Sequence, residues 1–203
     1  KTDVDLKSNK AVISLLSVID NKEFKKINDT VGTQSNFILR TQIFYPDGKT
    51  SSSLEDNNFT LTQNKQIEIK NSITIASPTL WSPENPASYI IRLELWRGEQ
   101  LIDRHDQSVV LLKIESSQNS FLLNGKDFSL YGVTYSPSFY QYGTLSSYDR
   151  MESDLEKIKQ AGFNSVRFSK SLPNPYYLRL CEQIGLLAFV ELPIANPPEG
   201  LVG

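Results

Sequence analysis

The hydrophobic pattern changes its period part-way along the chain, and this change limits the folds that the sequence can adopt. From residue 10 to about residue 115, apolar and polar residues alternate, as in Phe37–Ile43 and Tyr89–Leu95. Alternate side chains of a strand point to opposite faces, so such runs bury one face of a sheet and expose the other. Beyond Ser116–Asn119, apolar residues recur at helical spacing between short apolar runs. We therefore expect an all-β region followed by an α/β region.

The first region has the turn signals of a two-layer β-sandwich. Turn-forming residues separate its runs at Asp20-Asn21, Pro46-Asp47-Gly48 and Arg97-Gly98-Glu99. Six or seven short strands over ~100 residues, with no convincing helix, predict an all-β immunoglobulin-like sandwich, which we place at residues 1–116. The chain has a single cysteine, which excludes the disulfide of antibody domains.

The apolar run Ala11–Ile19 is the one part of this region without alternation. It suits a central strand that is buried on both faces. It also suits a short buried helix, and periodicity does not decide between the two.

Residues 117–203 predict strands that alternate with helices. The expected strands are Phe128–Tyr135, Asn164–Phe168 and Leu186–Val190, the last one covered on both faces. We expect the first helix to begin at Ser146, which forms a box-like cap with Asp149, and to end at Gly162. We expect the second helix to begin at Asn174-Pro175 and to end at Gly185. Such alternation predicts a parallel sheet, but three strands cannot close a barrel and would leave an open edge. We favour a piece of a larger fold over a small open layer.

Composition excludes several classes of partner. The formal net charge of −2 gives no support for binding nucleic acid or an anionic membrane. The longest apolar runs, such as Ile184–Val190, are too short to cross a bilayer, so no membrane segment is expected. His105 is expected at the surface or in a turn, and Cys181 in the core, so no metal and no cofactor are predicted. The chain begins at Lys1 without an initiator Met, and we expect both ends to be cut ends.

Several ordered motifs carry a family resemblance. They are Leu80-Trp81-Ser82-Pro83-Glu84-Asn85-Pro86, then Phe121-Leu122-Leu123-Asn124-Gly125-Lys126 with an Asn-Gly hairpin turn, then the stretches 154–167 (DLEKIKQAGFNSVR) and 175–186 (PYYLRLCEQIGL). In this order they resemble glycoside hydrolases of family 2, the group of β-galactosidases, β-glucuronidases and β-mannosidases. Within the first motif, Trp81 is expected to close the end of the sandwich.

The resemblance implies a sandwich followed by a partial (β/α)8 barrel, residues 117–203 being the N-terminal part of the catalytic domain. In the family, the two catalytic glutamates lie on later barrel strands, which this chain lacks. It is therefore expected to be an inactive fragment of a retaining glycosidase that cleaves O-glycosidic bonds. The implied partners are a carbohydrate substrate of the full-length protein and the rest of the barrel. A periplasmic or extracellular location is favoured over a cytoplasmic one. The alternative is a non-catalytic carbohydrate-binding or scaffold module from a degenerate family member.

The chain departs from the family at three strand ends. Thr134-Tyr135-Ser136-Pro137 stands where the family often has N-R-H-E, and Ser169-Lys170-Ser171-Leu172 where it often has S-H-Y-P. Val190-Glu191-Leu192-Pro193 stands where the family has D-E-x-N. Arg167 and Glu191 thus match the family pattern, whereas the histidines do not, so substrate specificity cannot be carried over.

Four residues are the candidate substrate-binding residues: Arg167, Glu191, Tyr135 and Lys170. The resemblance implies that Arg167 steadies the nucleophilic carboxylate; otherwise it bridges to a loop acid. Glu191 is either a substrate-side acid or the partner of Arg167. Tyr135 and Lys170 either line the pocket or lie in exposed loops.

Two further groups of residues invite a functional interpretation. The aromatic residues around the first βα loop either contact sugar or pack over the barrel rim; they are Tyr135, Phe139, Tyr140, Tyr142 and Tyr148. The acids of the first helix are expected to be ordinary surface charges; they are Asp149, Glu152, Asp154 and Glu156. No catalytic residue is assigned within this chain.

Overall fold

The chain divides into two compact units, each of which combines two separate stretches of the sequence. The computed structural model describes residues 1–20, 34–54, 56–62, 65–116, 120–136, 147–169 and 172–192. One unit comprises Lys1–Leu80 and Ala87–Lys113, and the other comprises Trp81–Pro86 and Ile114–Gly203. Trp81–Pro86 therefore belongs to the second unit, although the first unit surrounds it in sequence. The domain limits 1–116 and 117–203 stay a prediction.

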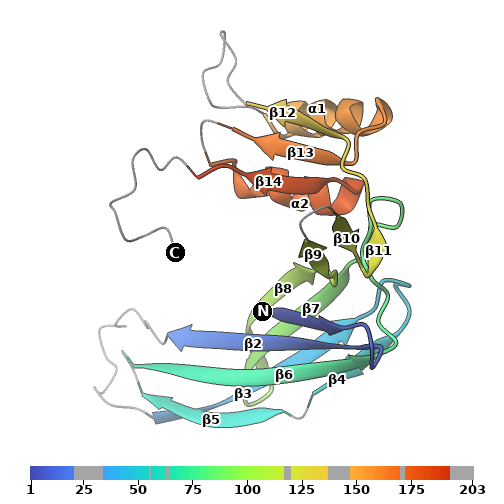
Figure 1. Ribbon diagram of the computed structural model, residues 1–203. Coiled ribbons are helices and arrows are strands. Elements are labelled where there is room, and N and C mark those ends of the chain that lie inside the picture. The colour runs from blue at the N-terminus through green and yellow to red at the C-terminus, as the bar shows by residue number, and fades with distance from the viewer. Residues whose placement is uncertain are drawn as a thin grey trace, which may run out of the picture. The chain divides into compact units, whose positions relative to one another are not determined.

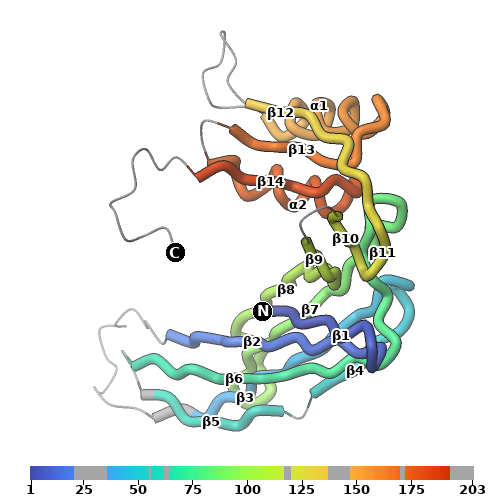
Figure 2. The backbone as a smooth tube through the Cα atoms, in the orientation of Figure 1, coloured from blue at the N-terminus to red at the C-terminus, as the bar shows by residue number. Residues whose placement is uncertain are grey.

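The first unit is a sandwich of two antiparallel sheets (Figure 1). One sheet has the order β1-β2-β6; the other has the order β4-β3-β7-β8, with β5 also paired to β3. The strands are β1 Thr2–Asp5, β2 Lys10–Asp20, β3 Gln34–Phe44, β4 Ser51–Ser53, β5 Asn57–Thr62, β6 Gln66–Ala76, β7 Tyr89–Arg97 and β8 Gln100–Val109. The backbone trace in Figure 2 follows the long β2 and β6, which pair along eleven residues.

The core of the first unit combines side chains from both sheets. Ile13 and Ile75 from one sheet pack in one cluster with Ile43 and Ile91 from the other, and each is at most 1% exposed. Tyr89 joins the cluster, and its hydroxyl accepts the Thr79 N–H at 2.8 Å. Burial raises the pKa of this phenol. The alternating apolar pattern therefore marks the inner faces of the sandwich.

Strand β2 differs from both structures that were considered for Ala11–Ile19. It is a strand rather than a helix, and it buries one face only: Leu16 is 59% and Val18 is 54% exposed. A two-layer sandwich covers each strand on one side, so an apolar run cannot be buried on both faces there.

The predicted turns within the described residues are confirmed, whereas the turn predicted at Asp20-Asn21 extends outside them. Pro46-Asp47-Gly48 lies between β3 and β4, and Asp47 accepts the N–H groups of Lys49 and Thr50. Arg97-Gly98-Glu99 joins β7 to β8. Asn124-Gly125 closes the hairpin of the short strands β10 (Phe121–Leu123) and β11 (Lys126–Asp127) in the second unit.

The second unit joins a small antiparallel sheet to a parallel α/β layer. Strand β9 (Ile114–Ser116) pairs with β10. The layer consists of β12 Gly132–Tyr135, α1 Tyr148–Gln160, β13 Ser165–Phe168, α2 Pro175–Ile184 and β14 Leu187–Val190. The three strands are parallel in the order β12-β13-β14, and both helices lie on one face of them (Figure 1).

The ends of the helices follow local capping chemistry. The N-cap of α1 is Ser147, whose side chain accepts the Arg150 N–H, and not Ser146, which lies outside the described residues. Asn174 caps α2 by accepting the Tyr176 N–H at 2.9 Å, and Pro175 is the first helical residue, as predicted.

The helices cover one face of the parallel sheet; on the other face Thr134, Arg167 and Phe189 are exposed, whereas Ser165 and Leu187 are buried. Leu155, Val166, Phe168, Tyr177 and Cys181 form the core between sheet and helices, each at most 1% exposed. The expectation that the last strand is covered on both faces is wrong, since Phe189 is 41% and Val190 is 37% exposed. Among the described strands, β14 pairs only with β13 and is therefore an edge strand.

Trp81–Pro86 is attached to the ends of both helices of the second unit. Trp81 is 2% exposed, and its indole Nε1–H donates to the carbonyl of Glu182 at 2.7 Å. This carbonyl is one of the last four of α2, which have no partner within the helix. Lys159, near the end of α1, donates to the carbonyls of Pro83 and Gly185, each at 2.8 Å. Trp81 thus caps α2, and this bond supplies the acceptor that a buried indole N–H needs; the closure of the sandwich by Trp81 stays a prediction.

Gly185→Ala should destabilise the fold more than Gly162→Ala. Both glycines have a positive φ, +83° and +90°, so each alanine costs about 1–2 kcal/mol in backbone strain. A Cβ at Gly185 would also clash with the Pro83 oxygen, whereas one at Gly162 meets nothing within 4 Å. Urea denaturation of the two variants measures the difference in the free energy of unfolding. Equal losses would contradict the close packing of the Trp81–Pro86 segment on α2.

Candidate active-site face

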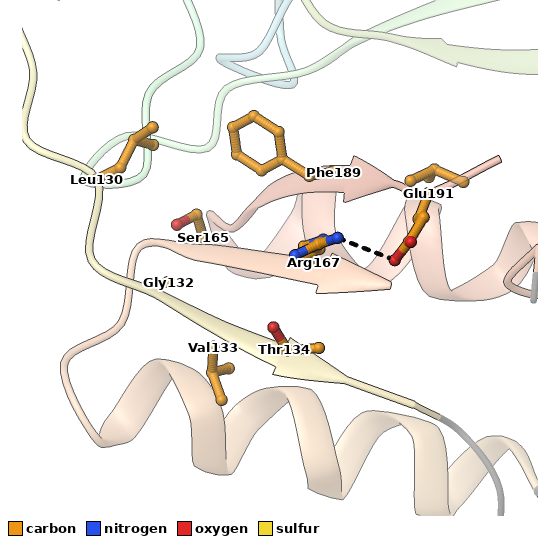
Figure 3. Close-up of a pocket in the computed structure, with 9 residues that line it drawn as sticks. Leu130, Gly132, Val133, Thr134, Ser165, Arg167, Phe189 and Glu191 are labelled. Atoms are coloured by element: carbon orange, nitrogen blue, oxygen red, sulfur yellow. Dashed lines mark hydrogen bonds and ion pairs between the residues drawn. The ribbon is translucent and has the colours of Figure 1, made fainter. Parts of the chain in front are cut away.

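The face of the parallel sheet opposite the helices carries a cavity of about 480 Å³. Its lining is Leu130, Gly132, Val133, Thr134, Ser165, Arg167, Phe189, Val190 and Glu191. Thr134 and Phe189 both pair in register with Arg167, so these three side chains lie side by side on the three strands (Figure 3). The cavity therefore reaches the carboxyl ends of the strands, which is where barrel enzymes build their active sites.

Arg167 and Glu191 form the charged part of this cavity. The Arg167 Nη2 donates to Glu191 Oε2 at 3.1 Å, as the dashed line in Figure 3 marks. The two side chains are 58% and 45% exposed, so water screens the pair and its contribution to stability is about 0–1 kcal/mol. The Glu191 N–H donates to the carbonyl of Phe168 at 3.0 Å, which fixes the backbone that carries the acid. The pair therefore contributes little to the stability of the fold.

Tyr135 lies on the opposite side of the sheet from this cavity. Its ring contacts Phe168 and Tyr177, with ring centroids 6.0 and 5.8 Å apart, among the residues between sheet and helices. Strand neighbours point to opposite faces, so Thr134 reaches the cavity and Tyr135 does not. Of the residues interpreted as sugar contacts or rim packing, Tyr148 contacts Tyr176 at 4.6 Å between ring centroids. Lys170, Phe139, Tyr140 and Tyr142 lie outside the described residues.

One acid of α1 is more than a surface charge. Asp154 has a side chain that is only 13% exposed, and it accepts the Tyr135 hydroxyl at 2.8 Å and pairs with Arg150. The expectation of an ordinary solvated acid is thus wrong for Asp154, because a tyrosine from β12 meets the helix there. Asp149, Glu152 and Glu156 are exposed, and Glu152 also accepts the Tyr176 hydroxyl at 2.6 Å.

The cavity residues that sequence reasoning missed include Thr134, Ser165 and Phe189. The signal that could have found them is strand parity. Ser165 lies two residues before Arg167 on the same strand and therefore on the same face. Thr134 and Phe189 follow only once the register of the neighbouring strands is known.

Neither His105 nor Cys181 is among the residues that line the cavity. His105 is exposed in the middle of β8, opposite Leu93. Cys181 is buried in the core of the second unit, where desolvation raises the pKa of its thiol to about 12. Among the residues that the structure describes, no three His, Cys, Asp or Glu side chains are grouped to hold a metal ion.

The Cys181 thiol should be inert in the native chain. A pKa that rises from 9.0 to about 12 lowers the thiolate fraction at pH 8 roughly a thousandfold, and burial blocks reagent access as well. We expect Ellman's reagent to titrate the thiol only after unfolding in urea. Rapid titration in native buffer would contradict the burial of α2 against the sheet.

Comparison with known proteins agrees with this arrangement of sandwich and α/β layer. The model of "Glycosyl hydrolases family 2" matches residues 2–109, and that of "Glycosyl hydrolases family 2, TIM barrel domain" matches residues 113–196. The chain belongs to glycosyl hydrolase family 2. Its architecture is accordingly a β-sandwich followed by the start of a TIM barrel.

Individual family 2 relatives are bacterial glycosidases. A β-galactosidase of Pectobacterium atrosepticum is 35% identical over 116 residues, which are 56% of this chain and 11% of the relative. A β-galactosidase of Thermoanaerobacter pseudethanolicus is 27% identical over 191 residues, 93% of this chain and 24% of the relative. The chain thus spans a quarter or less of the length of these relatives.

Solved structures of family 2 members share the fold. The crystal structure of a Bacteroides uniformis β-glucuronidase superposes with a TM-score of 0.81 at 22% identity, over 94% of this chain and 23% of that one. A family 2 member from Bacteroides cellulosilyticus gives a TM-score of 0.72 at 26% identity, over 93% and 25% of the two chains. In the described part of this chain, neither helix has the length and apolar character needed to cross a bilayer.

Proposed function

We propose that this chain supplies the immunoglobulin-like domain and the first barrel strands of a retaining glycoside hydrolase that cleaves β-glycosidic bonds. In this proposal, β12-α1-β13-α2-β14 is the opening part of a (β/α)8 barrel. The observation that carries it is the placement of Arg167 and Glu191 at the carboxyl ends of adjacent parallel strands, over an open cavity.

The number of acids in the described lining of the cavity supports the proposal that this part of the protein contributes to an active site without supplying the catalytic pair. Retaining glycosidases need two carboxyl groups ~5–5.5 Å apart, one as nucleophile and one as acid/base. The described lining of the cavity includes one carboxylate, Glu191, and Arg167 neutralises it. The reacting pair would therefore come from barrel strands other than β12, β13 and β14.

Arg167 would then act on the nucleophile that those strands supply. Its guanidinium has five N–H donors, and Glu191 occupies the Nη2 end at 3.1 Å. The fork can thus hold Glu191 on one side and a second carboxylate on the other. Donors that are oriented in advance stabilise developing charge without reorganisation during the reaction. Glu191 is the orienting partner of Arg167 in this scheme.

Hydrolysis of nitrophenyl β-galactosides, β-glucuronides and β-mannosides tests the proposal. The longer protein that contains this chain should turn over at least one of them, and the 203-residue chain should turn over none. Sugar binding by the longer protein without any turnover would favour a non-catalytic carbohydrate-binding module instead.

In that longer protein, Arg167→Lys should lower kcat about 10²–10³-fold, because a point charge cannot replace the two-sided guanidinium. The matched control is Arg179→Lys. Arg179 is exposed on α2, where its guanidinium stacks 5.6 Å from the Tyr176 ring, and it does not line the cavity. Steady-state kinetics with the preferred glycoside measures both. An unchanged kcat for Arg167→Lys, or equal losses of kcat for both variants, would contradict the proposed role of Arg167 in holding the nucleophile.

A further inference from the structure

The hydroxyl of Tyr135 connects the end of strand β12 to helix α1. It donates to Asp154 Oδ2 at 2.8 Å and lies 3.3 Å from the Tyr177 hydroxyl of α2. Asp154 is nearly buried and is held in turn by Arg150, whose Nε is 3.1 Å from Oδ1. Three polar groups from three elements therefore meet at one point behind the sheet.

The Tyr135 ring is fixed as firmly as its hydroxyl. It contacts Phe168 of β13 edge-on, at an interplanar angle of 87°, and it also contacts Tyr177. Phe168 and Tyr177 contact each other with ring centroids 5.4 Å apart, so the three rings form a closed triangle. The contacts of the ring and of the hydroxyl together favour one orientation of the Tyr135 side chain.

This orientation matters for the other face of the sheet. Tyr135 is the last residue of β12 and directly follows Thr134. Adjacent strand residues point to opposite faces, so locking Tyr135 behind the sheet locks Thr134 in front of it. Thr134 lines the cavity and pairs in register with Arg167.

We propose that Tyr135 is a positioning residue: through its hydrogen bond to Asp154, it holds the end of β12 so that Thr134 faces the cavity beside Arg167. For its catalytic consequence this proposal rests on the proposed function, but the geometric claim concerns the 203-residue chain itself. Tyr135 touches no substrate in this scheme and acts through Thr134.

Methyl NMR of Thr134 in the 203-residue chain tests the geometry. Tyr135→Phe keeps the ring and removes the hydroxyl, and we expect the Thr134 methyl resonance to shift or to broaden by exchange. Asp154→Asn, which keeps the size of the acceptor but weakens it, should shift the same resonance in the same direction.

The matched control is Tyr176→Phe. This substitution removes the 2.6 Å hydrogen bond from the Tyr176 hydroxyl of α2 to the Glu152 carboxylate of α1, and it does not involve β12. We expect the Thr134 methyl resonance to stay unchanged in this variant. An unchanged resonance in Tyr135→Phe, or an equal shift in Tyr176→Phe, would overturn the proposal.

Kinetics of the longer protein supply a second readout. Tyr135→Phe should lower kcat on the order of tenfold with KM little changed, since a misplaced wall of the site affects the transition state most. Tyr176→Phe should leave kcat unchanged. If the longer protein cleaves no glycoside, the proposed function fails while the NMR comparison still decides the positioning role. A Tyr135→Phe kcat equal to that of the parent protein overturns the catalytic part.

Discussion

The hydrogen bond from the Trp81 indole to the Glu182 carbonyl is the contact on which the organisation of the second unit depends. It joins two residues that are 101 positions apart in sequence. The last carbonyls of a helix need partners from outside the helix, and a buried indole N–H needs an acceptor, so each group satisfies the other. Trp81–Pro86 is therefore part of the second unit, and Gly185 has to be a glycine where Pro83 passes it.

This contact and the candidate site lie at opposite ends of the same strands. The end of α2 leads directly into β14, so Trp81 lies at the amino ends of the parallel strands. Arg167 and Glu191 lie at or beyond their carboxyl ends. In barrel enzymes, the amino ends of the strands stabilise the fold and the carboxyl ends carry the chemistry. The tight packing at one end of these strands and the exposed ion pair at the other follow the same division. The family membership of the chain agrees with this division.

Local signals in the sequence predicted much of this fold. Alternation marked the inner faces of the sandwich, and Asn124-Gly125, Asn174-Pro175 and Gly185 marked turns and helix ends because each has its own backbone chemistry. Arg167 and Glu191 could be proposed because they match the family pattern at, or just beyond, the ends of short apolar strands.

Contacts between distant parts of the sequence could not be predicted in the same way. Nothing near Trp81 in sequence names Glu182 as its acceptor. The face that Tyr135 takes depends on where β12 begins, and a shift of one residue would have sent it into the cavity. The three expected strands did predict an open edge, which β14 forms among the described strands, but the apolar run of β14 wrongly suggested cover on both faces.

The most direct test of this account is a crystal structure of the longer protein with a fluorinated glycoside trapped on its nucleophile. We expect a covalent sugar over the cavity of Thr134, Arg167 and Phe189, with the Arg167 guanidinium within hydrogen-bonding distance of the carboxylate that carries the sugar. A trapped sugar remote from Arg167 would contradict it.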